Sequence, residues 1–123
     1  MILRLALALL FCINLTSCAS KIGSVGTSSD HHVKYSYMYF NDIVVRYISA
    51  QAENTIIINY ASKVLQGNLI LKVLNPDNSI IAELETNTQS VAEIKAVHAG
   101  VYQLVIEGIK TKGSYDVSWE IKS

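Results

Sequence analysis

The thiol of Cys18 is the side chain with the clearest chemical role in this sequence. Arg4 precedes an unbroken apolar run from Leu5 to Ile13, and polar residues follow at Asn14 and Thr16. One basic residue ahead of about nine apolar ones is typical of a secretory signal peptide, whereas a membrane-spanning helix needs roughly 20 apolar residues. The sequence therefore predicts an exported chain whose leader ends close to Cys18.

The tetrapeptide Leu15-Thr16-Ser17-Cys18 resembles the lipobox of bacterial lipoproteins, in which small residues follow a Leu three positions before the cysteine. The resemblance implies that the Cys18 sulfur carries a lipid (palmitate or a similar acyl chain on diacylglycerol) and that cleavage falls between Ser17 and Cys18. Thr16 is a small departure, because Ala or Ser is commoner there. A plain secretory signal peptide with an incidental cysteine is the alternative.

Three segments follow from this interpretation. Residues 1–17 form the signal peptide, and residues 18–32 form the lipidated cysteine and a flexible tether, because Ser20 to Asp30 is rich in Ser, Gly and Thr. Residues 33–123 form a β-sandwich domain. Cys12 leaves with the signal peptide, so Cys18 would be a lone cysteine with no internal disulfide partner.

The expected location is the bacterial cell envelope, outside the cytoplasm. Ala19 follows the lipidated cysteine. In a two-membrane organism, this resembles lipoproteins that are sent to the outer membrane, because Asp at the position of Ala19 is the usual retention signal. In a single-membrane organism the protein would lie on the outer face of the cytoplasmic membrane.

Short alternating segments separated by turn signals dominate the rest of the chain. Period-2 alternation is typical of strands with one buried side. The predicted strands are Lys34 to Phe40, Ile43 to Ala50, Thr55 to Tyr60, Leu69 to Val73, Ile80 to Glu85, Val91 to Val97, Val101 to Glu107 and Tyr115 to Ile121. Ala61 to Gln66 is the one place for a helical turn. About eight short strands favour an all-β, antiparallel two-sheet sandwich of jelly-roll type.

Two aromatic residues are expected to serve this fold. Gly100-Val101-Tyr102 resembles a tyrosine corner, in which the phenol binds a nearby main-chain group. Trp119 lies on the buried face of the last strand. Core roles are favoured over ligand contacts for both.

The second half of the chain also resembles a known family. Leu74 to Asn78, Ala99 to Gly108 and Gly113 to Val117 are similar to the bacterial pre-peptidase C-terminal domain and to Golgi-dynamics-like domains. Gly113 to Trp119 also resembles the ending of a group of small bacterial lipoproteins. The resemblance implies a jelly-roll sandwich but no particular function, because these motifs are turns and core positions.

Enzyme chemistry finds little support. There is no Gly-x-Ser-x-Gly elbow and no HExxH or EF-hand spacing. His31 and His32 beside Asp30 could bind a metal, but a solvated loop is favoured, and His98 is expected in a surface turn. The sequence therefore predicts no enzyme, no catalytic residue, no cofactor and no metal site. Ten basic and ten acidic residues balance, which gives no argument for a nucleic-acid partner.

Two weaker ligand sites stay open. Asn75, Asp77 and Asn78 could supply calcium ligands, although a type I turn explains them equally well. Tyr35, Tyr37 and Tyr39 share one face of the first predicted strand. They would form an aromatic platform for a sugar or a protein if that face were outward, and part of the core if it were inward.

The predicted function is that of a membrane-anchored, extracytoplasmic, non-catalytic binding or adapter module. Its partners would be the membrane, through the lipid on Cys18, and an envelope protein or glycan. The alternative is a structural accessory subunit of an envelope assembly that pairs through an edge strand.

Overall fold

Antiparallel strands make up all the regular secondary structure of residues 21–123, the part of the chain that this computed structural model describes. The strands are β1 (Lys21–Ile22), β2 (Val25–Ser29), β3 (His32–Phe40), β4 (Ile43–Ala50), β5 (Thr55–Leu74), β6 (Ile80–Leu84), β7 (Gln89–Lys95) and β8 (Gly100–Lys122). The predicted signal peptide, lipobox and Cys18 lie outside the described residues. Within residues 21–123, no helix has the length and apolar character that a bilayer crossing requires.

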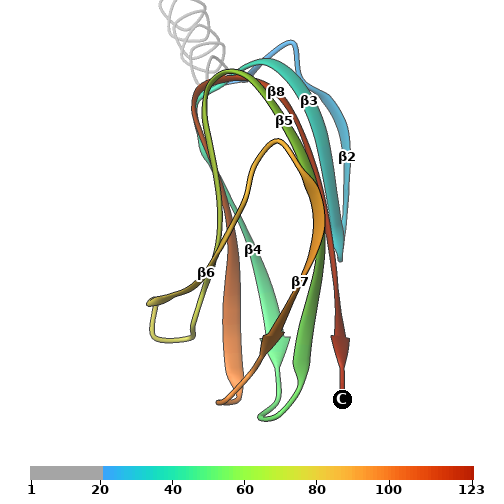
Figure 1. Cartoon of the computed structure of the whole chain (residues 1–123), viewed down its shortest axis with the longest axis vertical. Coiled ribbons are helices and arrows are strands. Elements are labelled where there is room, and N and C mark those ends of the chain that lie inside the picture. Colours follow the sequence, from blue (N-terminus) through green and yellow to red (C-terminus); the bar gives the residue numbers. More distant parts are fainter. Residues whose placement is uncertain (1–20) are drawn as a thin grey trace, which may run out of the picture.

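Two long strands, β5 and β8, determine the architecture. They run side by side, bend together at one end of the molecule and return, so that a continuous sheet folds over into two layers (Figure 1). Their register shifts between Val64 and Asn68, where Gly67 adopts a φ of 71° and Lys110 a φ of 47°. An irregular pairing of this kind bends strands sharply, so the bend is built into both strands at the same level.

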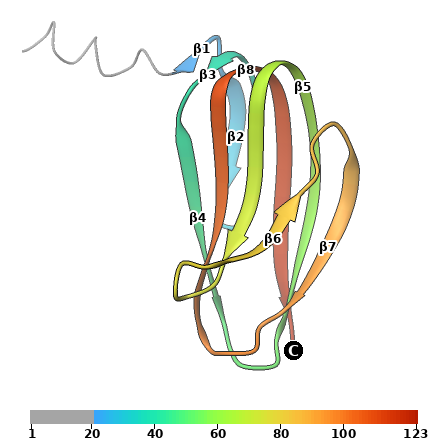
Figure 2. The same ribbon diagram turned by 60° about the vertical axis from the view of Figure 1, so that its left-hand side comes forward.

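The fold is therefore a two-layer sandwich. Layer A contains β4, residues 100–109 of β8, residues 68–74 of β5 and β6, in that order. Layer B contains β2, β3, residues 111–122 of β8, residues 55–64 of β5 and β7. β1 pairs with the far end of β3. The two views together show the layers facing each other along the long axis of the domain (Figures 1 and 2).

Alternate residues of each strand fill the space between the layers. On β8, Tyr102, Leu104 and Ile106 from layer A and Val117 and Trp119 from layer B are all buried in one core. Further large inward side chains come from β3 and β5, among them Val33, Tyr37, Phe40, Ile56, Ile58, Leu71 and Val73, and from β4 and β6, namely Ile48 and Leu84. The prediction of an all-β antiparallel sandwich is confirmed, and Trp119 is a core residue as expected.

The strand lengths differ from the prediction in one respect. Each of the eight predicted segments coincides with a strand, although Glu85 lies beyond the end of β6 and Ala96 and Val97 lie beyond the end of β7. Thr55 to Tyr60 and Leu69 to Val73 are two parts of β5, and the last two segments are two parts of β8. The helical turn considered for Ala61 to Gln66 is wrong, because these residues continue β5 against β8 up to the bend.

The segment assigned to the tether also contains strands. Residues 25–29 form β2, which pairs with residues 32–36 of β3, and β1 pairs with Tyr39 and Phe40. The side chains of β2 are all exposed, so main-chain hydrogen bonds rather than apolar burial hold it. The ordered domain thus begins before residue 33, where the sequence analysis had placed its start.

Two predicted local motifs are present. The hydroxyl of Tyr102 donates to the carbonyl of His98 over 2.8 Å, which is the expected tyrosine corner. At the β5–β6 turn, the amide of Asn78 donates to the carbonyl of Asn75 over 2.9 Å, and Asn78 has a φ of 69°. Asparagine tolerates this left-handed conformation better than most residues do.

Candidate functional site

The three tyrosines considered as an aromatic platform do not share an exposed surface. Tyr37 is 5 % exposed and packs against Phe40, with ring centroids 5.1 Å apart. Tyr35 is half-buried against the core, and its ring centre lies 6.0 Å from that of Tyr115. Tyr39 is half-buried as well. The aromatic side chains of β3 therefore lie in the core or at its edge.

Burial changes the acidity of this aromatic cluster. Burial raises the pKa of Tyr115 far above its usual value, the neighbouring phenols of Tyr35 and Tyr37 raise it further, and Arg46 opposes the shift. Burial also raises the pKa of Tyr37, with a smaller opposing effect from the hydroxyl of Thr111. These phenols stay protonated at neutral pH and are structural groups.

The two adjacent histidines point to different partners. Nε2 of His32 lies 2.5 Å from Oδ1 of Asp116 on layer B, and the ring of His31 meets Trp119 edge-on at 6.2 Å. Nζ of Lys34 lies 4.0 Å from the other oxygen of Asp116. All three polar side chains are substantially exposed, so this ion pair contributes little to stability.

No cluster of three or more metal-ligating side chains occurs within residues 21–123. In the turn considered for calcium, Oδ1 of Asp77 accepts hydrogen bonds from the amide and the hydroxyl of Ser79, at 3.0 and 2.6 Å. These bonds hold the pKa of Asp77 below its usual value. The same oxygen that would bind an ion thus stabilises the turn.

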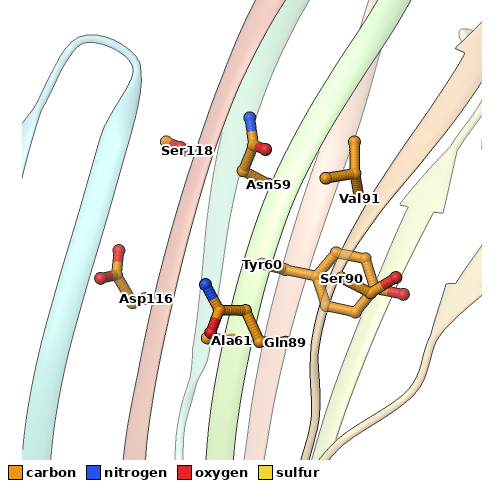
Figure 3. Close-up of a pocket in the computed structure, with 8 residues that line it drawn as sticks. All are labelled: Asn59, Tyr60, Ala61, Gln89, Ser90, Val91, Asp116 and Ser118. Atoms are coloured by element: carbon orange, nitrogen blue, oxygen red, sulfur yellow. The ribbon is translucent and has the colours of Figure 1, made fainter.

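The outer face of layer B carries a shallow polar groove. Its larger part, ≈ 420 Å³, is lined by Asn59, Tyr60, Ala61, Gln89, Ser90, Val91, Asp116 and Ser118 (Figure 3). A second hollow of ≈ 240 Å³ shares Ala61 and Asp116 with it and extends over β3. The small side chains of Ala61 and Ser118 leave this face hollow between longer neighbours.

This groove offers hydrogen-bonding groups without an aromatic surface. The register brings Asn59, Ser118 and His32 into one cross-strand row, and Gln89, Asp116 and Lys34 into the next. The buried ring of Tyr60 belongs to the core. A polar outer face is what the alternation of a half-buried sheet requires, so the groove needs no ligand to explain its composition.

The outer face of layer A departs from that rule. Eight apolar side chains point away from the core on this face, which we call the layer A face: Ile43, Val45, Tyr47, Ile70, Leu74, Ile80, Val101 and Val105. Tyr47 is 69 % exposed, and Ile43, Ile80 and Val101 are exposed too. A water-facing sheet surface of this kind is unusual, because antiparallel sheets normally place polar residues outward.

Register and burial support the assignment of these residues to one face. Val105 is opposite Val45 on β4 and Lys72 on β5. It is only 6 % exposed, yet it lies outside the core cluster to which its neighbours Leu104 and Ile106 belong. Val105 is therefore covered by its cross-strand neighbours on the outside of the sandwich.

The edge of layer A adds a second feature. β4 pairs with β8 in regular register from Ile43 to Ala50 without a bulge, and its other side has no strand neighbour among the described residues. Its sequence contains no proline and a single charge, at Arg46. Proteins usually protect edge strands with bulges, proline or several charges, so β4 is a weakly protected edge beside an apolar face.

This surface was not predicted, although the sequence contains a signal for it. Ile43-Val44-Val45 and Tyr47-Ile48 are apolar on both faces of the strand. Such a run predicts an ordinary strand, because apolar residues on both sides are also typical of fully buried strands. The register with β8, whose residues Tyr102, Leu104 and Ile106 face the core, shows that half of the apolar side chains of β4 face outward.

No protein-family model and no curated protein match this chain. The similarity of its second half to the pre-peptidase C-terminal domain therefore stays a prediction.

Solved structures that are similar to the chain include the following three. A periplasmic lysozyme inhibitor of g-type lysozyme, PliG from Aeromonas hydrophila, has a TM-score of 0.48 and 15 % identity over 80 % of this chain and 89 % of that chain. A CBM4 structure has a TM-score of 0.45 and 14 % identity over 85 % and 80 % of the two chains. TmCBM61 in complex with beta-1,4-galactotriose has a TM-score of 0.44 and 13 % identity over 81 % and 70 %. Likeness at this level concerns the sandwich fold alone.

Proposed function

We propose that this protein is a lipid-anchored, extracytoplasmic binding module that holds a protein partner, without catalysis, on its layer A face. The single observation that carries the proposal is the composition of that face, where eight apolar side chains lie outside the core. Exposed apolar surface of this kind, here interspersed with Lys72, Gln103 and Glu107, often marks an interaction site. The polar outer face of layer B shows that the usual alternation holds in the other layer of this chain.

The chemistry of the layer A face favours a protein over a glycan. Sugar recognition relies on exposed aromatic rings, and Tyr47 is the one aromatic residue among the eight. Aliphatic side chains around a single exposed tyrosine are typical of the centre of protein interfaces. Gln103, which lies among them, already donates its side-chain amide to Asn78 over 2.9 Å. The partner surface that fits is therefore apolar and supplied by a protein.

A structural accessory role is the second candidate, and the geometry of β4 favours it. Eight residues in regular register leave one side of β4 available for main-chain pairing. A strand from a neighbouring protein could extend layer A at this edge and cover part of the layer A face at the same time. Face binding and edge pairing differ in one respect, since only the second needs the main-chain groups of β4.

The anchoring part of the proposal is tested at Cys18. Cells that express the full chain and are fed labelled palmitate should incorporate the label into this protein, and Cys18→Ala should abolish incorporation, because the thiol is the acceptor. The control is Cys12→Ala, which removes a cysteine of the predicted signal peptide and should leave labelling intact. Labelling that persists in Cys18→Ala contradicts the anchoring.

The binding part is tested by a photoreactive phenylalanine derivative placed at Tyr47 in intact cells. Illumination should yield discrete protein cross-links of reproducible mass. The matched control is the same probe at Val91, which is 55 % exposed on the outer face of layer B. Equal cross-linking from the two positions would show that the layer A face has no special role.

A further inference from the structure

The bend of the sandwich gathers exposed apolar side chains at one end of the molecule. We define the bend tip as residues 38–43, 63–68 and 108–113, where β3 ends, β4 begins and both β5 and β8 turn over. Met38 is 65 %, Leu65 57 % and Ile109 40 % exposed. Leu65 is the residue left between the paired positions Val64 and Gln66. These side chains contribute little to the core and project from the end of the domain.

The same tip is basic. Lys63, Lys110 and Lys112 lie in these segments, against one acidic residue, Asp42. Asp42 accepts a hydrogen bond from the amide of Ile43 over 2.8 Å. The turns at the opposite end, residues 51–54, 75–79 and 96–99, contain Glu53 and Asp77 and no lysine or arginine. The bend tip thus carries three lysines against Asp42, whereas Glu53 at the opposite end is paired with Lys95, whose Nζ lies 2.8 Å from a carboxylate oxygen of Glu53.

The chain enters the domain at this tip. Lys21 pairs with Phe40 and Ile22 with Tyr39, so β1 lies beside β3 at the same end of the molecule as the bends of β5 and β8 (Figure 2). Cys18 precedes Lys21 by three residues, which span at most about 10 Å when fully extended. A lipid on Cys18 would therefore hold the bend tip within a short distance of the membrane surface.

We propose that the bend tip docks on the membrane that holds the Cys18 lipid. Met38, Leu65 and Ile109 enter the interfacial region, and the three lysines meet anionic headgroups, in the manner of other peripheral membrane surfaces. The inference rests on the lipid anchoring of the proposed function and adds a second contact to it. Its consequence is an upright domain, with the layer A face directed sideways and accessible to a partner in the same membrane.

The test uses the mature lipidated protein reconstituted in vesicles that contain the anionic lipid phosphatidylglycerol. An environment-sensitive fluorophore is attached to Leu65→Cys, whose new thiol is free while Cys18 is lipidated. The matched control is Val97→Cys, since Val97 is 64 % exposed and lies in a turn at the opposite end. Lipids with a nitroxide just below the headgroup should quench the probe at position 65 several-fold and leave the probe at position 97 bright.

Each outcome of the quenching experiment either supports or contradicts docking of the bend tip. Vesicles that carry the protein but quench both probes equally, or neither, overturn the docked tip and leave the anchoring intact. Protein that fails to float with vesicles overturns the anchoring and the inference together. If the fluorophore at position 65 stays shielded from water when the protein is in detergent micelles, a protein surface covers it. This result also contradicts docking of the bend tip on the membrane. Lys63→Glu combined with Lys110→Glu should reduce quenching at position 65 while the protein still floats.

Discussion

Single residues close the turns of this sandwich, and Tyr102 does so most clearly. Its ring fills the core at 1 % exposure while its hydroxyl reaches the carbonyl of His98 at the entrance to β8. A glycine-x-tyrosine pattern ahead of an alternating strand was sufficient to predict this contact. The pairing of His32 with Asp116 could not be predicted, because 84 residues separate them and only the β3–β8 register brings them together.

Removing the hydroxyl of Tyr102 should lower the stability of the fold. Tyr102→Phe keeps the ring but leaves the His98 carbonyl without its donor, so we expect the free energy of unfolding to fall by about 1 kcal/mol. Urea unfolding followed by Trp119 fluorescence measures the change. Tyr47→Phe, which alters an exposed tyrosine, should leave stability unchanged, and equal effects of the two substitutions would contradict the structural role of Tyr102.

The buried phenols make stability sensitive to alkali. Burial is the main reason that the pKa of Tyr115 in the folded protein lies above the usual tyrosine value of about 10. The folded state therefore keeps its proton where the unfolded state loses it, so the contribution is fully present below pH 10 and is lost as pH rises above that value. The urea midpoint should fall between neutral pH and about pH 11.

The control for this effect is Tyr115→Phe, which removes the titrating group. The fall in urea midpoint should be smaller in this variant than in the wild type, whatever the stability of the variant at neutral pH. An equal fall in both proteins would show that the burial of Tyr115 does not cause the alkaline sensitivity.

At the scale of elements, the sequence pattern identified strands well and their connections poorly. Period-2 alternation located each predicted strand to within two residues of its end, because one buried face leaves a clear signal. It did not show that β5 and β8 each pass through both layers, since residues 61–66 carry no turn signal and continue the strand. β2 was not predicted for the opposite reason. None of its side chains is buried, and its Ser, Gly and Thr residues are typical of a flexible tether.

The strand β2 depends on close main-chain contact at Gly26. A Cβ at this position would lie 2.0 Å from the carbonyl oxygen of Lys34. Gly26→Ala should therefore separate β2 from β3 while the core, to which β2 contributes no side chain, stays folded. Hydrogen exchange read by mass spectrometry should show faster exchange in residues 25–29 and their partners 32–36.

The matched control is Ser28→Ala, which changes an exposed side chain of the same strand and should leave exchange as in the wild type. If Gly26→Ala also leaves these amides protected, then β2 is not held against β3 as the structure has it, and the tether interpretation of residues 18–32 regains support.

At the scale of the whole molecule, the two layers have unlike outer faces. Layer B is mostly polar outside and apolar inside, as a sandwich in water requires, whereas the outer face of layer A carries eight apolar side chains among the polar ones of Lys72, Gln103 and Glu107. The two-layer fold could be predicted from the sequence, but this asymmetry could not, because apolar residues on both faces of a strand are also typical of a fully buried strand. The proposed anchor at the bend tip would leave the layer A face free to meet a partner beside the domain.

The most direct test of the proposed function compares two lysine substitutions in the lipidated protein. Tyr47→Lys places a charge in the layer A face, and Val91→Lys places one at a similarly exposed position on layer B. Protein cross-linked in intact cells is recovered, and the partner captured with it is quantified by mass spectrometry. We expect Tyr47→Lys to reduce the recovered partner by about tenfold or more, as for a central interface residue, and Val91→Lys to have no effect. Equal recovery with both variants would contradict the layer A face as the binding surface.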